Sequence, residues 1–177
     1  MRSARDGARA LLQALSAEPT VVAHLERSAL AAVEDRPGPA QFAAAGPRTA
    51  GRAREYELLL EMIIEGSRLH YGPQRIVRTD DQDLALLLGD QLYALGLARL
   101  AAVGDLEAIA ELAEVISLVA EAQASGDAAL ADAVWAAGAV AIGWGQDEQH
   151  ALAKRLARAG DRGARQALQA AALVTSS

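Results

Sequence analysis

The chain has 177 residues, of which 52% are hydrophobic and only 3% aromatic, and it carries a formal net charge of −6 and no cysteine. This length suits one domain with a sizeable core, and apolar residues with so few aromatics favour closely spaced helices over sheets. The acidic balance provides no basic field for nucleic acid, and the lack of cysteine excludes disulfides and thiolate chemistry. We therefore expect a single all-α domain over residues 1–177, a compact helical bundle that does not bind nucleic acid.

The N-terminal third is predicted to contain three helices and one irregular segment. A short amphipathic helix covers residues 4–15, and a second begins near Pro19 and runs to about residue 34. The segment 35–48 holds three prolines and two glycines, which predicts a loop that Phe42 tethers. Thr49 is the predicted N-cap of a third helix that extends to about His70.

The stretch 83–100 is the longest run that is apolar on nearly every side, which is typical of a helix in the middle of a bundle. Leucines at helical spacing form one stripe, while Leu86 and Leu97 make the opposite side apolar as well. Gly89 inside the helix predicts a close helix crossing or a kink, because glycine there costs about 1 kcal/mol relative to alanine. We expect Asp90, inside the same apolar stretch, to be a buried carboxylate with a hydrogen-bond or arginine partner.

The C-terminal half is predicted to form four further helices. Gly104-Asp105 and Gly126-Asp127 each combine a helix-ending glycine with a new N-cap. The helices are expected at about 106–125, 128–142, 146–159 and 161–174, and residues 175–177 are expected to fray. In the first of these, Glu107, Glu111, Glu114 and Glu121 are expected to form the solvated face.

Three segments resemble the trans-type polyprenyl diphosphate synthases. Residues 86–105, LLLGDQLYALGLARLAAVGD, are similar to the family segment that reads roughly L-A-G-D-x-L-x-x-x-A-x-x-x-L-A-x-x-G-D. Residues 55–70 resemble the family helix that ends in the first aspartate-rich motif, and residues 136–145 resemble the helix that precedes the second. The resemblance implies part of the isoprenoid-synthase fold.

The aspartate-rich motifs themselves are missing from the corresponding positions. Prenyl transfer needs facing carboxylate clusters that bridge Mg²⁺ to a diphosphate. Residues 70–74 contain no carboxylate, and residues 146–150 contain only the adjacent Asp147 and Glu148, which point to different helix faces. The resemblance thus implies the small non-catalytic subunit of a two-component, heptaprenyl- or hexaprenyl-type synthase. Such a subunit pairs with a catalytic chain, which alone holds Mg²⁺, and influences product length.

Candidate site residues follow from these patterns, and no catalytic residue is among them. The cluster Asp80, Asp81 and Asp83 is open to a metal interpretation, although capping of the next helix explains it with fewer assumptions. The residues expected at an interface or a helix crossing are Gly89, Asp90, Leu92, Tyr93 and Gly96, and those that are candidates to line a ligand site are His70, Tyr71, Trp135 and Trp144.

The remaining expectations concern partners and compartment. No run approaches the roughly 20 apolar residues that span a bilayer, so we expect no membrane span and a cytoplasmic protein. The broad apolar surface of residues 83–100 predicts a homo- or hetero-oligomer. The alternative to the synthase subunit is a stand-alone helical interaction or small-molecule-binding protein that forms a homodimer.

Overall fold

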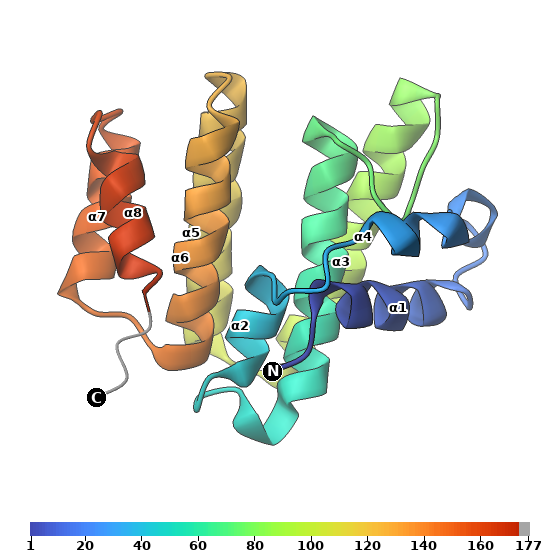
Figure 1. The fold of residues 1–177 in the computed structure, drawn as a ribbon, viewed down its shortest axis with the longest axis horizontal. Coiled ribbons are helices and arrows are strands. Elements are labelled where there is room, and N and C mark those ends of the chain that lie inside the picture. Colours follow the sequence, from blue (N-terminus) through green and yellow to red (C-terminus); the bar gives the residue numbers. More distant parts are fainter. Residues whose placement is uncertain (174–177) are drawn as a thin grey trace. The chain divides into compact units, whose positions relative to one another are not determined.

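The computed structural model describes residues 1–173, and these residues are helical with no strand among them (Figure 1). The all-α prediction is confirmed for this part of the chain, whereas the predicted fraying of residues 175–177 lies outside it. The α-helices are α1 (Ala4–Leu15), α2 (Pro39–Ala45), α3 (Ala53–Tyr71), α4 (Gln82–Val103), α5 (Leu106–Ala124), α6 (Ala128–Trp144), α7 (Glu148–Arg158) and α8 (Ala164–Ala171). Short 3₁₀ helices are η1 (Val22–His24), η2 (Arg27–Ala32) and η3 (Ala50–Arg52).

Contacts along the chain group into two compact units. The first unit comprises Met1–Gln41 and Arg54–Gly104, and the second comprises Phe42–Ala53 and Asp105–Ser177. The division falls inside α2, so the chain passes from the first unit to the second twice and returns once.

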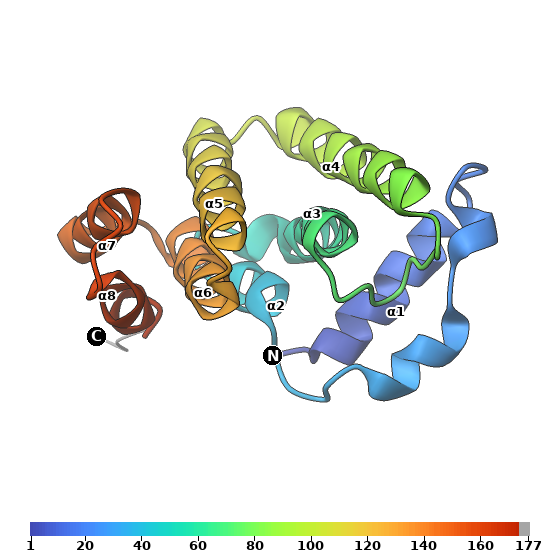
Figure 2. The same ribbon diagram turned by 90° about the horizontal axis from the view of Figure 1, so that it is seen from above.

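The core of the first unit is built where α1, α3 and α4 meet. Leu11 and Leu15 of α1 pack with Met62 of α3 and Leu92 of α4, all nearly inaccessible to solvent. Figure 2 shows α4 running beside α3, with α1 crossing below them. Residues 4–15 therefore form the predicted amphipathic helix, and its apolar side faces the two long helices.

The predicted helix from Pro19 to residue 34 is wrong, because this segment forms only η1 and η2. Between them the chain is extended and pairs with the segment that follows α3. Glu26 N–H donates to Ile76 O at 2.8 Å and Arg78 N–H donates to His24 O at 2.9 Å. In an α-helix these backbone groups would form hydrogen bonds within the helix. The long-range pairing therefore overrides local helix propensity.

The segment 35–48 is less irregular than predicted, because it contains α2. Phe42 does not tether it: its side chain is 38% exposed, while the neighbouring Gln41 is buried. Thr49 precedes η3 and does not cap α3. Its hydroxyl donates instead to Ala43 O at 2.6 Å, because the end of α2 leaves this carbonyl without a helical partner.

The second unit is made of closely packed helices rich in small residues. α5 and α6 form a hairpin, and α8 packs on both α6 and α7. Gly126, at φ 74°, ends α5, and Asp127 accepts from the Leu130 N–H to begin α6, as the Gly-Asp pattern predicted. A Cβ on Gly138 of α6 would lie 2.2 Å from Val115 Cγ2 of α5, so the glycine allows the two helices of the hairpin to pack this closely.

Candidate functional site

Three glutamates spaced by four residues lie buried along one face of α3. Glu57, Glu61 and Glu65 are each at most 3% exposed, and we call them the α3 carboxylate row. Residues at i, i+4 and i+8 share one helix face, so the sequence places all three on the same side. Charged groups are this deeply buried only when other groups hydrogen-bond to them, so the row must have partners.

Partners of the row come first from the loop after α3. Arg75 donates through Nη2 to Glu61 at 2.6 Å and through Nε to Glu65 at 2.9 Å. Glu65 also accepts from the backbone N–H groups of Ile76 and Val77. Burial alone would lower the pKa of Arg75, but the two carboxylates outweigh it and hold that pKa well above its usual value. The loop is therefore fixed onto α3 by a permanently charged guanidinium.

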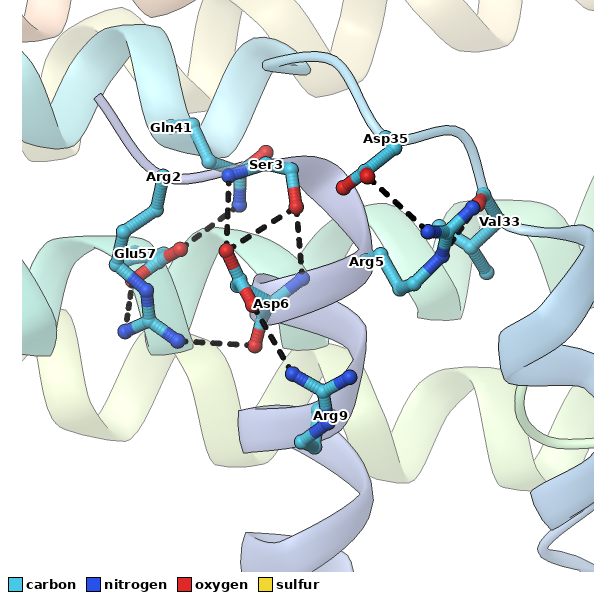
Figure 3. Close-up of polar contacts among 9 residues, drawn as sticks. All are labelled: Arg2, Ser3, Arg5, Asp6, Arg9, Val33, Asp35, Gln41 and Glu57. Atoms are coloured by element: carbon cyan, nitrogen blue, oxygen red, sulfur yellow. Dashed lines mark hydrogen bonds and ion pairs between the residues drawn. The ribbon is translucent and has the colours of Figure 1, made fainter.

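Further partners come from the N-terminus and from α2. Arg2 Nη1 lies 2.8 Å from Glu57, and Gln41 Nε2 donates to Glu57 at 3.0 Å (Figure 3). Gln41 Nε2 also donates to Glu61 at 2.9 Å. Gly7 of α1 fits against these groups, since a Cβ there would lie 2.4 Å from Glu61 Oε1. The row thus links the N-terminal segment, the start of α2 and the loop after α3 within the first unit.

The row serves as an anchor for segments without regular structure. Its carboxylates already accept hydrogen bonds from Arg2, Gln41 and Arg75 and from backbone N–H groups. Within the described residues, no group of three or more His, Cys, Asp or Glu side chains is placed to hold a metal ion. Sequence reasoning missed the row, although the spacing E-x₃-E-x₃-E within an otherwise apolar helix was visible.

α3 and α4 approach closely at glycines of both helices. A Cβ on Gly66 would lie 2.9 Å from Gly89 O, and one on Gly89 would lie 2.7 Å from the His70 ring. About two turns further along α4, a Cβ on Gly96 would lie 2.9 Å from Leu59 O. Gly89 and Gly96 therefore lie on the face of α4 that packs against α3.

Asp90 is not the buried carboxylate that the sequence predicted, because its side chain is 71% exposed. Gly89 and Leu92, its neighbours on α4, are buried, whereas Asp90 is exposed. His70 Nε2 lies 3.1 Å from Asp90 Oδ1, close enough for an ion pair when the imidazole is protonated but not aligned as a hydrogen bond. Burial raises the pKa of the neighbouring Tyr93 hydroxyl, which hydrogen-bonds to Ser67.

The opposite face of α4 is uncovered, so the helix does not lie in the middle of a bundle as its apolar pattern suggested, and it leaves the broad apolar surface that the sequence led us to expect. Leu87 is 66% exposed, and Leu86 and Leu97 are each 40% exposed. We call the exposed surface the α4 outer face; it consists of Leu86, Leu87, Asp90, Ala94, Leu97, Ala98 and Ala101. It extends over about 22 Å along the helix at 1.5 Å per residue.

By length and composition, α4 is also the one helix in the described part that could cross a membrane, which is weak evidence for a span. The packing argues against it. α4 lies against α3, which carries the α3 carboxylate row along its length, and such charges are costly in hydrocarbon. This is consistent with the expected absence of a membrane span.

The residues predicted to line a ligand site belong to two different units. His70 and Tyr71 end α3 in the first unit, with ring centroids 5.8 Å apart. Trp135 is buried in α6 of the second unit, and Trp144 at the end of α6 is 40% exposed. Of the aspartates 80, 81 and 83, Asp81 is the N-cap of α4 and accepts from Leu84 N–H at 3.1 Å.

The second unit contains a buried ion pair that corrects the prediction for α5. Glu111 is only 2% exposed rather than part of a solvated face, and Lys154 of α7 donates to it at 2.6 Å. Lys154 also lies 2.5 Å from Glu114. Burial raises the pKa of Glu111, whereas the two carboxylates outweigh burial and raise the pKa of Lys154. Lys154 is the only lysine of the chain, which could have drawn attention to it.

His150 and Asp147 lie at the start of α7, one turn before Lys154. Asp147 caps the helix through the His150 N–H at 2.8 Å, and His150 Nδ1 lies 2.8 Å from the same Asp147 oxygen. These contacts hold the His150 ring, which is 6% exposed. They lower the pKa of Asp147, chiefly through the backbone N–H of His150. The pair is thus a helix cap with a fixed imidazole.

No family model, curated protein or solved structure matches this chain significantly.

Proposed function

We propose that this chain is a non-catalytic helical subunit that binds a catalytic polyprenyl diphosphate synthase chain through the α4 outer face and influences the length of its product. The observation that carries the proposal is the exposure of Leu86, Leu87 and Leu97 on one side of a long apolar helix. Contiguous exposed apolar surface on a folded protein typically marks an interface. The resemblance of residues 86–105 to the synthase family suggests the class of partner.

The α4 outer face also suggests the chemistry of the surface that covers it. Leucines at 86, 87 and 97 surround a centre of small side chains, Ala94 and Ala98, which would let a partner helix approach closely. Asp90 is the one charge on this face, so a partner helix with apolar side chains and one Lys or Arg is complementary to it. Catalysis, Mg²⁺ and substrate would then belong to the partner, in the cytoplasm.

The test is co-expression with the aspartate-motif synthase chain of the same organism, followed by purification and a prenyl-transfer assay. We expect a stable complex whose products differ in length from those of the synthase alone, and no turnover by this chain alone. Leu87→Gln should weaken the complex, whereas Leu106→Gln, at a leucine of α5 that is 77% exposed, should not. A synthase that neither binds the chain nor changes its products would overturn the proposal. A homodimer whose interface is the α4 outer face would favour the alternative, a stand-alone helical interaction or small-molecule-binding protein.

A further inference from the structure

A cavity of about 430 Å³ opens in the first unit beside the α3 carboxylate row. η2, the start of α2, α3 and the loop after α3 surround it. Its volume lies within the range of about 300–1,000 Å³ that is usual for small-molecule sites. Its lining includes the apolar side chains of Ala29, Ala32, Val33 and Ile64 and the three arginines Arg68, Arg75 and Arg78.

The carboxylates that line the cavity already have cationic or amide partners. Glu61 accepts from Arg75 and Gln41, and Glu34 pairs with Arg36. Arg75 is in turn committed to the α3 carboxylate row. None of these groups therefore offers an unmatched negative charge to a ligand.

Arg78 is different, because its side chain forms no hydrogen bond or ion pair with the rest of the described chain. Glu26 lies within electrostatic reach of it, but the Glu26 carboxylate accepts from Ser28 instead. The backbone of Arg78 is fixed by its bond to His24 O and by the bridge between Leu25 and Val77. A guanidinium on a fixed backbone is thus presented at the cavity without a partner.

Gln74 adds a second hydrogen-bond donor to the lining of the cavity. Its side-chain oxygen accepts from Thr79 N–H at 2.9 Å, which orients the amide and leaves its NH₂ group to donate. Two donors on a loop with a fixed backbone, together with apolar side chains in the same cavity, match an anionic head group with an aliphatic part. From this arrangement we infer that the cavity binds a small organic anion, a carboxylate or a phosphate ester on a short aliphatic chain, through Arg78 and Gln74. This inference is independent of the proposed subunit role.

The test is titration of the full chain with four six-carbon probes: hexanoate, hexyl phosphate, hexanol and hexylammonium, followed by calorimetry or NMR. We expect at least one anion to bind about tenfold or more tightly than hexanol and hexylammonium, since a hydrogen bond to a charged group contributes roughly 1.5–3 kcal/mol. Comparison of the two anions distinguishes a carboxylate ligand from a phosphate ligand.

Two variants at exposed positions and one control locate the site. Arg78→Gln should weaken anion binding about tenfold while leaving hexanol unchanged, and Ala32→Phe, which fills the cavity, should weaken every probe. Arg99→Gln, at an exposed arginine of α4 outside the cavity, should change nothing. Circular dichroism checks that each variant is folded. Binding of hexanol as tight as that of the anions, anion binding unaffected by Arg78→Gln, or no binding up to about 10 mM would each overturn the inference.

Discussion

The two units are stabilised in different ways. In the first unit, buried carboxylates on α3 hold an N-terminal segment, part of α2 and a loop that have little regular structure of their own. In the second unit, short loops connect helices that approach closely through glycine and alanine, and among its described residues the buried charges are those around Lys154. Irregular segments leave backbone N–H groups without helical partners, and side-chain carboxylates can supply the missing acceptors. The contrast predicts that charge removal should damage the first unit most and added volume the second.

Glu65→Gln should give the largest loss of stability. The Glu65 side chain is fully buried and accepts hydrogen bonds from Arg75 and from two backbone N–H groups. The NH₂ group of a glutamine in its place would face one of these N–H donors, and that hydrogen bond would be lost. Breaking a buried charge pair costs about 3–5 kcal/mol, so we expect a loss of about 4 kcal/mol in urea unfolding. Glu121→Gln, at an exposed glutamate of α5, is the control and should be near neutral. Equal effects of the two changes would show that the row does not anchor the first unit.

Gly46→Ala should have the next largest effect. A Cβ on Gly46 would lie 2.0 Å from Gly143 O, and the Arg48 N–H donates to the same oxygen at 3.0 Å. The clash is with backbone, so the end of α2 and the end of α6 must separate, at about 3 kcal/mol. Gly51→Ala, in the same segment with open space around it, is the matched control. A loss below about 0.5 kcal/mol at Gly46 would contradict the close packing of the second unit.

Lys154→Met should destabilise the second unit by about 2 kcal/mol near neutral pH, because it leaves Glu111 charged and buried. The loss should shrink as the pH falls. Burial raises the pKa of Glu111 above its usual 4.5, so the cost of its charge is present above that raised pKa and is relieved below it. The pKa of Glu114 is lowered: burial opposes the shift, but hydrogen bonds from Lys154 and Arg158 outweigh it. The stabilisation that Glu114 receives is therefore also lost in acid.

Denaturation of the wild type and of Lys154→Met between pH 7 and pH 4 measures how the loss of stability changes with pH. Arg155→Met, at an exposed position of α7, is the control and should show little loss at any pH in this range. A Lys154→Met loss that stays constant or grows as the pH falls would show that the buried charge of Glu111 is not its cause.

Gly89→Ala should have the smallest effect of these, a loss of about 1 kcal/mol, because the nearest obstacle is the His70 ring, which can rotate. A solvent-facing glycine in a helix would instead be stabilised by alanine, by up to about 1 kcal/mol. The sign of the change in thermal unfolding therefore tests the close crossing of α3 and α4.

Helix periodicity and caps allowed most α-helices to be predicted, because these signals are local. The Gly-Asp pairs at 104–105 and 126–127 are such signals, and both mark helix ends in the structure. The segment from Pro19 to residue 34 could not be predicted correctly, since its conformation depends on pairing with the distant residues Ile76 to Arg78.

Site residues were harder to predict because burial depends on tertiary partners. Asp90 in an apolar helix looked buried, yet it lies on the α4 outer face. Glu111 beside other glutamates looked solvated, yet Lys154 from a distant helix makes its burial tolerable. The leucines of α4 differ in burial along the same helix, since an apolar residue can remain exposed on the surface of a folded protein.

The role of the α4 outer face is the central claim, and sedimentation velocity of this chain mixed with the aspartate-motif synthase chain tests it most directly. We predict one faster-sedimenting complex that contains both chains for the wild type and for Leu106→Gln, and separate boundaries for Leu87→Gln, whose stability should change by no more than about 0.5 kcal/mol. Separate boundaries for the wild type, or a complex that Leu87→Gln leaves intact, would contradict the claim.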